Sequence, residues 1–202
     1  TSPESAQALL QLALSKEFEE KESAALEYYA RISKDFPGTD ASEKAAGATR
    51  RLQSEGRTID FRGRTIKGEP FDLSKLAGRP VVIQYWATWC DACKQDMKLL
   101  RQLQAKYQAA GLTIVGVNVD STREDALGYL KENPAPWIHL YEDGGLDSSG
   151  LAKQLGVQTL PLMMLIDASG KVVSNNIYAA SLEAEIAKIA KAPKAPATQP
   201  RK

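Results

Sequence analysis

Several residue types that other functions depend on are scarce in this chain of 202 residues. A zinc site usually needs about four Cys or His ligands, but the chain has only two cysteines and one histidine. We therefore expect no metal site and no bound cofactor. Basic and acidic side chains nearly balance, 26 against 25, so charge gives no reason to expect nucleic acid as a partner. The longest apolar run, Leu160 to Ile166, is too short to cross a bilayer, and no transmembrane segment is expected.

The two cysteines lie three residues apart in Trp89-Cys90-Asp91-Ala92-Cys93. Without a third cysteine there is neither a disulfide framework nor a spare thiol. A purely structural disulfide here would close a very small loop and constrain the unfolded chain little. A redox-active dithiol is therefore the favoured interpretation. His139, the single histidine, follows an apolar stretch and is expected to be structural.

Residues 1–56 lack strand patterns and carry apolar residues at helical spacing. Ser2 and Pro3 predict a helix start, and Asp40 with Glu43 predicts another after Pro37-Gly38. The segment around Tyr28-Tyr29-Ala30-Arg31-Ile32 resembles a tetratricopeptide-type repeat. We expect a small all-α helical hairpin, which either packs on the main domain as a cap or binds a protein partner.

From residue 57 the pattern changes to short strands alternating with helices, which predicts an α/β fold. We expect strands over residues 81–86 and 112–119, and a hairpin of residues 162–166 with 171–174. Helices are expected over residues 91–110, 121–133 and 181–191, the second beginning with a capping box at Ser121 and Glu124. Residues 192–202 are rich in proline, alanine and basic residues and are predicted to be disordered.

Three stretches together carry a family resemblance. They are Gly68-Glu69-Pro70-Phe71-Asp72-Leu73, the run from Gly78-Arg79-Pro80 to Ala87-Thr88-Trp89-Cys90, and Gly156-Val157-Gln158-Thr159-Leu160-Pro161. In this order they resemble the TlpA/ResA-type branch of the thioredoxin superfamily. The resemblance implies a thioredoxin-like domain over residues 57–191, with a central mixed sheet flanked by helices. It also implies a thiol–disulfide oxidoreductase that acts on protein disulfides, as a reductant.

The position of each cysteine predicts its role. Cys90 lies at a helix start, where free backbone N–H groups favour a thiolate, so we expect it to be the nucleophile. Cys93, one turn later, is expected to be the resolving thiol. Asp91 adds a negative charge that disfavours the Cys90 thiolate and predicts a reducing couple, at about −270 mV rather than about −120 mV.

Further site residues follow from the resemblance. It implies that Pro161 is cis and lies beside the cysteines, and that Leu160 and Thr159 contact a substrate strand. Trp89 is expected to shape the substrate surface. The family often has a glutamate where this chain has the shorter Asp96, which either handles the proton of Cys93 or is an ordinary surface carboxylate. Gln84 stands where thioredoxin has a buried aspartate, so this position supplies no general base.

Members of this branch are usually exported, and the chain begins with Thr1. A signal peptide, a lipid-anchored leader or a deliberate truncation would each explain that start. We expect a periplasmic or cell-envelope protein that receives electrons from a membrane-linked or soluble donor, with a cytoplasmic location as the alternative. Two other functions stay open: a peroxiredoxin-like peroxidase that uses Cys90 on peroxide, and a non-catalytic partner-binding module.

Overall fold

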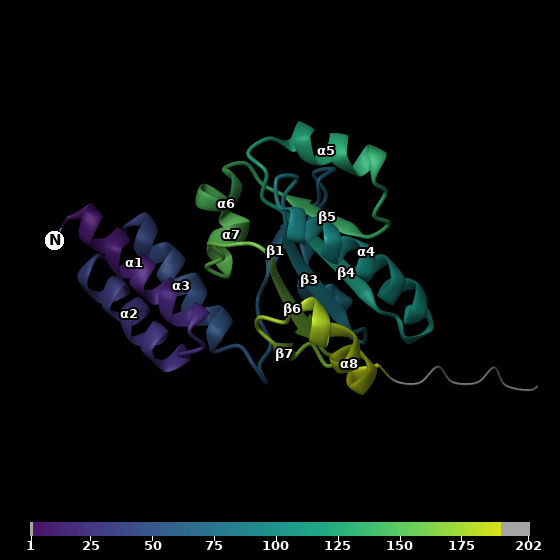
Figure 1. Cartoon of the computed structure of the whole chain (residues 1–202), viewed down its shortest axis with the longest axis horizontal. Coiled ribbons are helices and arrows are strands. Elements are labelled where there is room, and N and C mark those ends of the chain that lie inside the picture. The colour runs from purple at the N-terminus through teal and green to yellow at the C-terminus, as the bar shows by residue number, and fades with distance from the viewer. Residues whose placement is uncertain (1, 191–202) are drawn as a thin grey trace, which may run out of the picture.

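The computed structural model describes residues 2–190 and contains two parts that lie side by side (Figure 1). Three helices form the helical unit, residues 2–52, and residues 57–190 form the sheet body. The tail predicted to be disordered, residues 192–202, lies outside the described residues. Within residues 2–190, no helix is both long and apolar enough to cross a membrane.

The sheet body is built on a mixed five-stranded sheet in the order β5-β4-β3-β6-β7. Strands β3, β4 and β5 are mutually parallel, whereas β6 runs antiparallel to β3, and β7 antiparallel to β6. Their bounds are β3 (Val81–Trp86), β4 (Thr113–Asn118), β5 (Ile138–Tyr141), β6 (Leu162–Ile166) and β7 (Val172–Ser174). Every residue of β3 is buried, as its β-branched and aromatic composition predicts. The expected thioredoxin-like fold class is confirmed.

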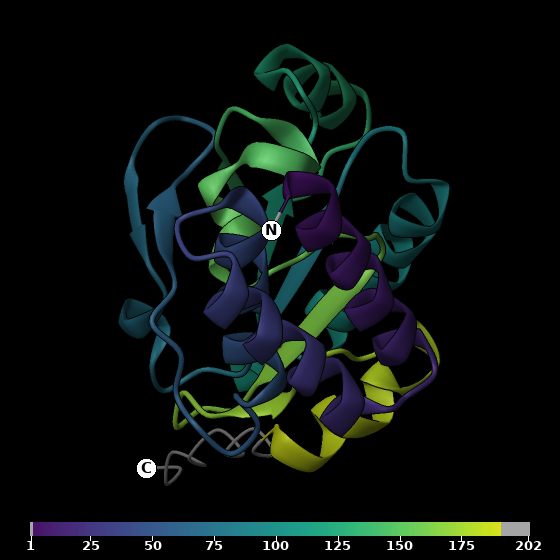
Figure 2. The same cartoon turned by 90° about the vertical axis from the view of Figure 1, so that its left-hand side faces the viewer.

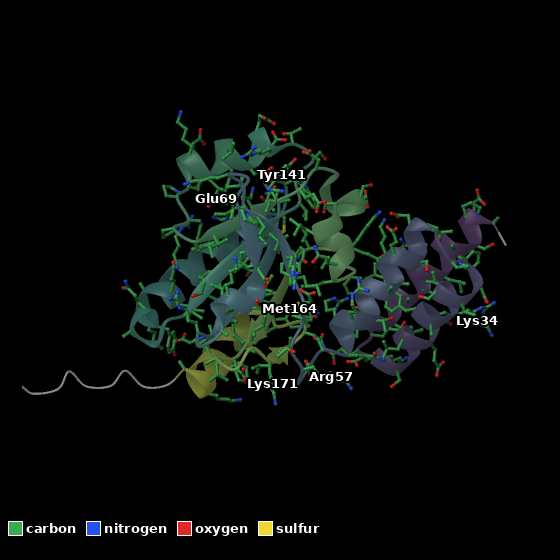
Figure 3. The ribbon with its side chains drawn as sticks, turned by 180° about the vertical axis from the view of Figure 1, so that it is seen from behind. Lys34, Arg57, Glu69, Tyr141, Met164 and Lys171 are labelled. Atoms are coloured by element: carbon green, nitrogen blue, oxygen red, sulfur yellow. A yellow bond between two sulfur atoms is a disulfide. The ribbon has the colours of Figure 1, made fainter. Side chains whose placement is uncertain are left out.

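Different elements cover the two faces of this sheet. On one face, α4 (Asp91–Lys106) and α8 (Ala179–Ile189) pack over Val82. On the other, α6 (Gly145–Ser148), α7 (Gly150–Gln154) and a two-stranded sheet of β1 (Arg62–Arg64) and β2 (Pro70–Asp72) cover Ile83. Helix α5 (Arg123–Glu132) links β4 to β5, and short 3-10 turns, η1 (Leu73–Leu76) and η2 (Gln108–Ala110), follow β2 and α4. Met164, in the middle of β6, lies at the centre of the sheet body in Figure 3.

The helical unit consists of α1 (Pro3–Phe18), α2 (Glu22–Asp35) and α3 (Asp40–Leu52), so it has three helices rather than the two of a hairpin. It buries a hydrophobic cluster of its own, made largely of small residues: Ala6, Leu10, Ala13, Ala25, Tyr29, Ile32, Ala45 and Ala48. Figure 2 shows the three helices in front of the sheet body, and Figure 3 shows Lys34 at the end far from it. The likeness of this unit to a tetratricopeptide repeat stays a prediction.

Three predicted helix boundaries need correction. Ser2 caps α1 as expected, but the cap of α3 is Thr39, whose hydroxyl accepts the N–H of Ser42, and not Asp40. The cap of α5 is likewise Thr122 instead of Ser121. In both cases the threonine has the extended backbone that a capping hydroxyl needs to reach the third N–H of the helix. The helix predicted over residues 91–110 ends at Lys106 and continues as η2.

Candidate active site

The cysteine pair lies where β3 ends and α4 begins. Cys90 is the N-cap residue of α4, and its sulfur accepts the backbone N–H of Cys93 at 3.2 Å. The two sulfurs are joined in a disulfide, with their Cα atoms 5.3 Å apart. The N–H groups of this first helical turn have no carbonyl partner within the helix, so they can stabilise a thiolate on Cys90 after reduction.

The two sulfur-bearing residues differ in exposure. Cys90 keeps 7% of its surface accessible and Cys93 keeps none. The Sγ atom of Cys93 lies 3.7 Å from the carbonyl oxygen of Tyr85, inside the sheet body. Of the two cysteines, only Cys90 is therefore open to solvent.

Gln84 fixes the first turn of α4 on the sheet. Its side chain is fully buried, and Nε2 donates a hydrogen bond to the carbonyl oxygen of Cys93 at 3.1 Å. Because an amide neither gains nor loses a proton near neutral pH, Gln84 holds the helix without acting as a base.

A buried carboxylate that sequence analysis missed holds the loop before Cys90. Asp120, 1% exposed, accepts the backbone N–H of Thr88 at 3.0 Å and its hydroxyl at 2.8 Å. Asn118 donates a third hydrogen bond at 2.7 Å. A buried charge is tolerated when it is hydrogen-bonded in this way. The available signal was its place just after the strand predicted over residues 112–119.

Two acidic side chains of α4 have opposite environments. Asp96 is half-buried, and this burial raises its pKa, as a proton acceptor for Cys93 would require. Asp91 is exposed and pairs with Lys94 at 2.7 Å, and the hydrogen bond from Lys94 lowers its pKa. Lys94 therefore offsets part of the negative charge that was expected to disfavour the Cys90 thiolate.

The second site element is the turn that leads into β6. The Leu160–Pro161 peptide bond is cis, as the resemblance implied. Because Leu162 is paired with Tyr85, this turn lies beside the end of β3, from which the chain continues to Cys90. Leu160 packs against the core cluster that contains both cysteines. Its backbone N–H and carbonyl make no hydrogen bond to any residue of the described range 2–190, so they are free to pair with a bound strand.

The remaining predicted site residues lie at the surface near this turn or near the disulfide. Trp89, next to Cys90, is 58% exposed, which is unusual for so large an apolar side chain. Thr159 is half-buried and precedes Leu160. Pro161 is exposed as well.

His139 belongs to the core, as predicted. It is 6% exposed, packs against Trp86 and Trp137, and has Nε2 3.1 Å from the carbonyl oxygen of Ala135. Burial lowers the pKa of His139 to about 4, so the ring is neutral at neutral pH. Across residues 2–190, His, Cys, Asp and Glu side chains form no group of three or more that would suit a metal ion.

Two curated relatives resemble this chain. The thiol-disulfide oxidoreductase ResA of Bacillus thuringiensis subsp. konkukian is 29% identical over 108 residues, which cover 54% of this chain and 60% of ResA. The thiol:disulfide interchange protein DsbE of Escherichia coli K12 is 36% identical over 94 residues, which cover 46% of this chain and 46% of DsbE. The chain thus spans only about half of the length of these relatives.

Solved structures share the fold of the sheet body. A Chlorobium tepidum protein provisionally named thiol:disulfide interchange protein DsbE has a TM-score of 0.58 at 30% identity, covering 66% of this chain and 95% of that one. A thiol-disulfide oxidoreductase from Bacteroides fragilis has a TM-score of 0.58 at 26% identity, covering 65% of this chain and 97% of that one.

The Redoxin family matches residues 56–192, beginning where the helical unit has ended. With the cysteine pair and the turn into β6 in the positions described, the chain belongs to the redoxin family.

Proposed function

We propose that this protein is a thiol–disulfide oxidoreductase that reduces disulfides in other proteins. The observation that carries the proposal is the disulfide at the start of α4, with Cys90 reaching the surface and Cys93 buried behind it. The names of the relatives, thiol-disulfide oxidoreductase and thiol:disulfide interchange protein, support the same chemistry.

The reaction runs in two exchanges. The Cys90 thiolate attacks one sulfur of the substrate disulfide, which breaks that S–S bond, releases one substrate thiolate and forms a mixed disulfide. The Cys93 thiolate then attacks the Cys90 sulfur, which releases the second substrate thiolate and leaves Cys90 and Cys93 joined. Two electrons pass to the substrate, and the released thiolates take up protons. An external dithiol must then reduce the protein again.

Other side chains support these steps. Asp96 accepts the proton of Cys93 before the second exchange, a role that its raised pKa suits. The free backbone of Leu160 pairs with an extended segment of the substrate, beside Thr159 and Pro161. Trp89 gives that segment an apolar surface to lie on.

The setting of the reaction is also part of the proposal. By its resemblance to the TlpA/ResA-type branch, the protein works in the periplasm or cell envelope and draws electrons from a membrane-linked or soluble donor. The helical unit offers a surface to a protein partner. Because the sequence pattern changes from helical to alternating strands and helices at residue 57, we divide the chain into a helical segment of residues 1–56 and a redox domain of residues 57–191.

Insulin reduction with dithiothreitol as electron donor tests the function. The wild-type protein should accelerate precipitation of the reduced insulin chains, and Cys90→Ser should reduce the rate to the uncatalysed background, because the attacking sulfur is lost. Retained turnover in Cys90→Ser would overturn the assignment. Peroxide consumption measured on the same samples separates disulfide exchange from a peroxidase, for which peroxide would be consumed and insulin would not be reduced.

A further inference from the structure

A buried arginine joins the helical unit to the segment that leads into the active-site turn. Arg51 of α3 is 2% exposed. Its Nε donates to the carbonyl oxygen of Leu155 at 3.0 Å, just after α7, and its Nη2 donates to Glu17 of α1 at 2.7 Å. The carbonyls at the end of a helix lack partners within it, so Arg51 caps α7 from a different part of the chain.

A buried tyrosine extends the same network to the next residues. The hydroxyl of Tyr29 in α2 donates to Glu17 at 2.5 Å and accepts from Nε2 of Gln158 at 3.4 Å. Burial raises the pKa of Tyr29, so its hydroxyl keeps the proton that it donates. Glu17 thereby ties Arg51 and Tyr29 together, and all three helices contribute to one polar network.

Close backbone packing fixes the start of this segment as well. A Cβ atom on Gly47 of α3 would lie 2.0 Å from the carbonyl oxygen of Lys153, and one on Gly156 would lie 2.0 Å from the amide nitrogen of Ala48. Gly156 also has a φ of +58°, a conformation that glycine adopts easily. Neighbouring Arg50 donates to the carbonyl oxygen of Gln154 at 3.0 Å.

The contacts therefore follow the chain from residue 154 to residue 158, and the next three residues are Thr159, Leu160 and Pro161. A loop that pairs with a substrate strand binds more tightly when its conformation is fixed beforehand, since less conformational entropy is then lost. The helical unit supplies that restraint, although it contributes no residue to the disulfide itself.

We propose that the helical unit positions the turn of residues 159–161 for protein substrates, with Arg51, Tyr29 and Gln158 as positioning residues. This inference rests on the proposed function, because it assigns to the turn the pairing with substrate described above. If the helical unit only stabilised the fold, changes in it would affect all disulfide substrates alike. The positioning role instead predicts an effect only on substrates that have a polypeptide to pair with the turn.

Two disulfide substrates make that distinction in the full-length protein. Insulin offers an extended polypeptide, whereas bis(hydroxyethyl) disulfide has no backbone to pair with Leu160. Tyr29→Phe removes the hydroxyl that links Glu17 to Gln158, and Gln158→Ala removes the other end of the same link. Tyr28→Phe, the same change on the neighbouring half-buried tyrosine of α2, is the matched control.

Both test variants should raise the KM for insulin about five-fold, the effect of one neutral hydrogen bond. The rate with bis(hydroxyethyl) disulfide and the reduction potential should stay at their wild-type values, and Tyr28→Phe should match the wild type throughout. Hydrogen exchange in the peptide covering residues 156–162 should become faster in both test variants. Arg51→Lys, which keeps the charge but cannot reach Leu155 and Glu17 together, should have a larger effect in the same direction.

Different results overturn the two proposals. If the wild type reduces insulin and the test variants do so with unchanged KM, the positioning role is wrong and the proposed function stands. Equal loss of activity on both substrates would also contradict the positioning role, because the effect would then act on the cysteine pair. If the wild type reduces neither substrate, the proposed function fails. Unchanged hydrogen exchange of residues 156–162 in the test variants would independently show that the helical unit does not restrain the turn.

Discussion

The helical unit and the sheet body are held together internally by different kinds of contact. The helical unit packs small side chains between neighbouring helices, and the hydroxyl of its buried Tyr29 donates to Glu17 within the unit. The sheet body buries large side chains such as Trp86 and Tyr85 of β3, and β3 pairs with β6, a strand far away in the sequence. The two parts meet through directed polar contacts and two glycines. The unit can therefore fold from local contacts, whereas its orientation on the sheet body depends on a few specific residues.

Removing the helical unit tests most severely whether the two parts fold independently. A chain lacking residues 1–53 should still fold and still exchange with bis(hydroxyethyl) disulfide, because the hydrophobic clusters of the sheet body are separate from that of the helical unit. It should be less stable by roughly 3 kcal/mol, since the charged hydrogen bonds from Arg50 and Arg51 to the end of α7 are lost. Circular dichroism shows whether the shortened chain folds, and thermal unfolding measures how much stability it has lost. An unfolded product would show that the two parts form one cooperative domain.

The elements that could be predicted from the sequence are those that depend on local patterns. The strand Val81–Trp86, the start of α4 and the hairpin of β6 and β7 each depend on a short pattern, and each was predicted within a few residues. The cysteine pair and Pro161 belong to local motifs of this kind. Their roles in the reaction remain predictions.

Contacts between distant parts of the chain could not be predicted in this way. Arg51 and Leu155 are 104 residues apart, and Thr88 and Asp120 are 32 apart. Neither pair leaves a pattern in a single sequence, because an arginine on a helix or an aspartate after a strand is usually solvated. The break between α1 and α2 was not predicted either, because residues 19–21 contain no proline or glycine to mark it.

A smaller change sharpens the assignment of Asp96. Asp96→Asn should lower the insulin turnover rate by about 100-fold, the lower end of what a general base contributes, and the loss should be greatest near neutral pH. Burial raises the pKa of Asp96, so the folded state holds its proton more firmly than the unfolded state. The carboxylate therefore costs stability above its folded pKa, and Asp96→Asn should be more stable than the wild type at pH 7 but not in acid. The pH profiles of rate and melting temperature together test this. A rate unchanged at every pH would make Asp96 an ordinary surface carboxylate.

The smallest expected effect concerns the redox potential. Asp91→Asn should make the couple more oxidising by about 10–20 mV, the equivalent of one exposed charge at a helix N-terminus. The change removes a negative charge and also frees Lys94, and both favour the Cys90 thiolate. Lys94→Gln should shift the potential in the opposite direction. Equilibration with glutathione buffers measures both variants, and a more reducing Asp91→Asn would contradict the local charge argument.

The central claim is that Cys90 attacks the substrate and Cys93 resolves the mixed disulfide. Mass spectrometry of Cys93→Ser after incubation with a disulfide-bonded protein tests it most directly. The account predicts a stable covalent adduct on Cys90, released by dithiothreitol, and no lasting adduct with the wild type or with Cys90→Ser. A lasting adduct on Cys93 in Cys90→Ser, or none on Cys90 in Cys93→Ser, would contradict it.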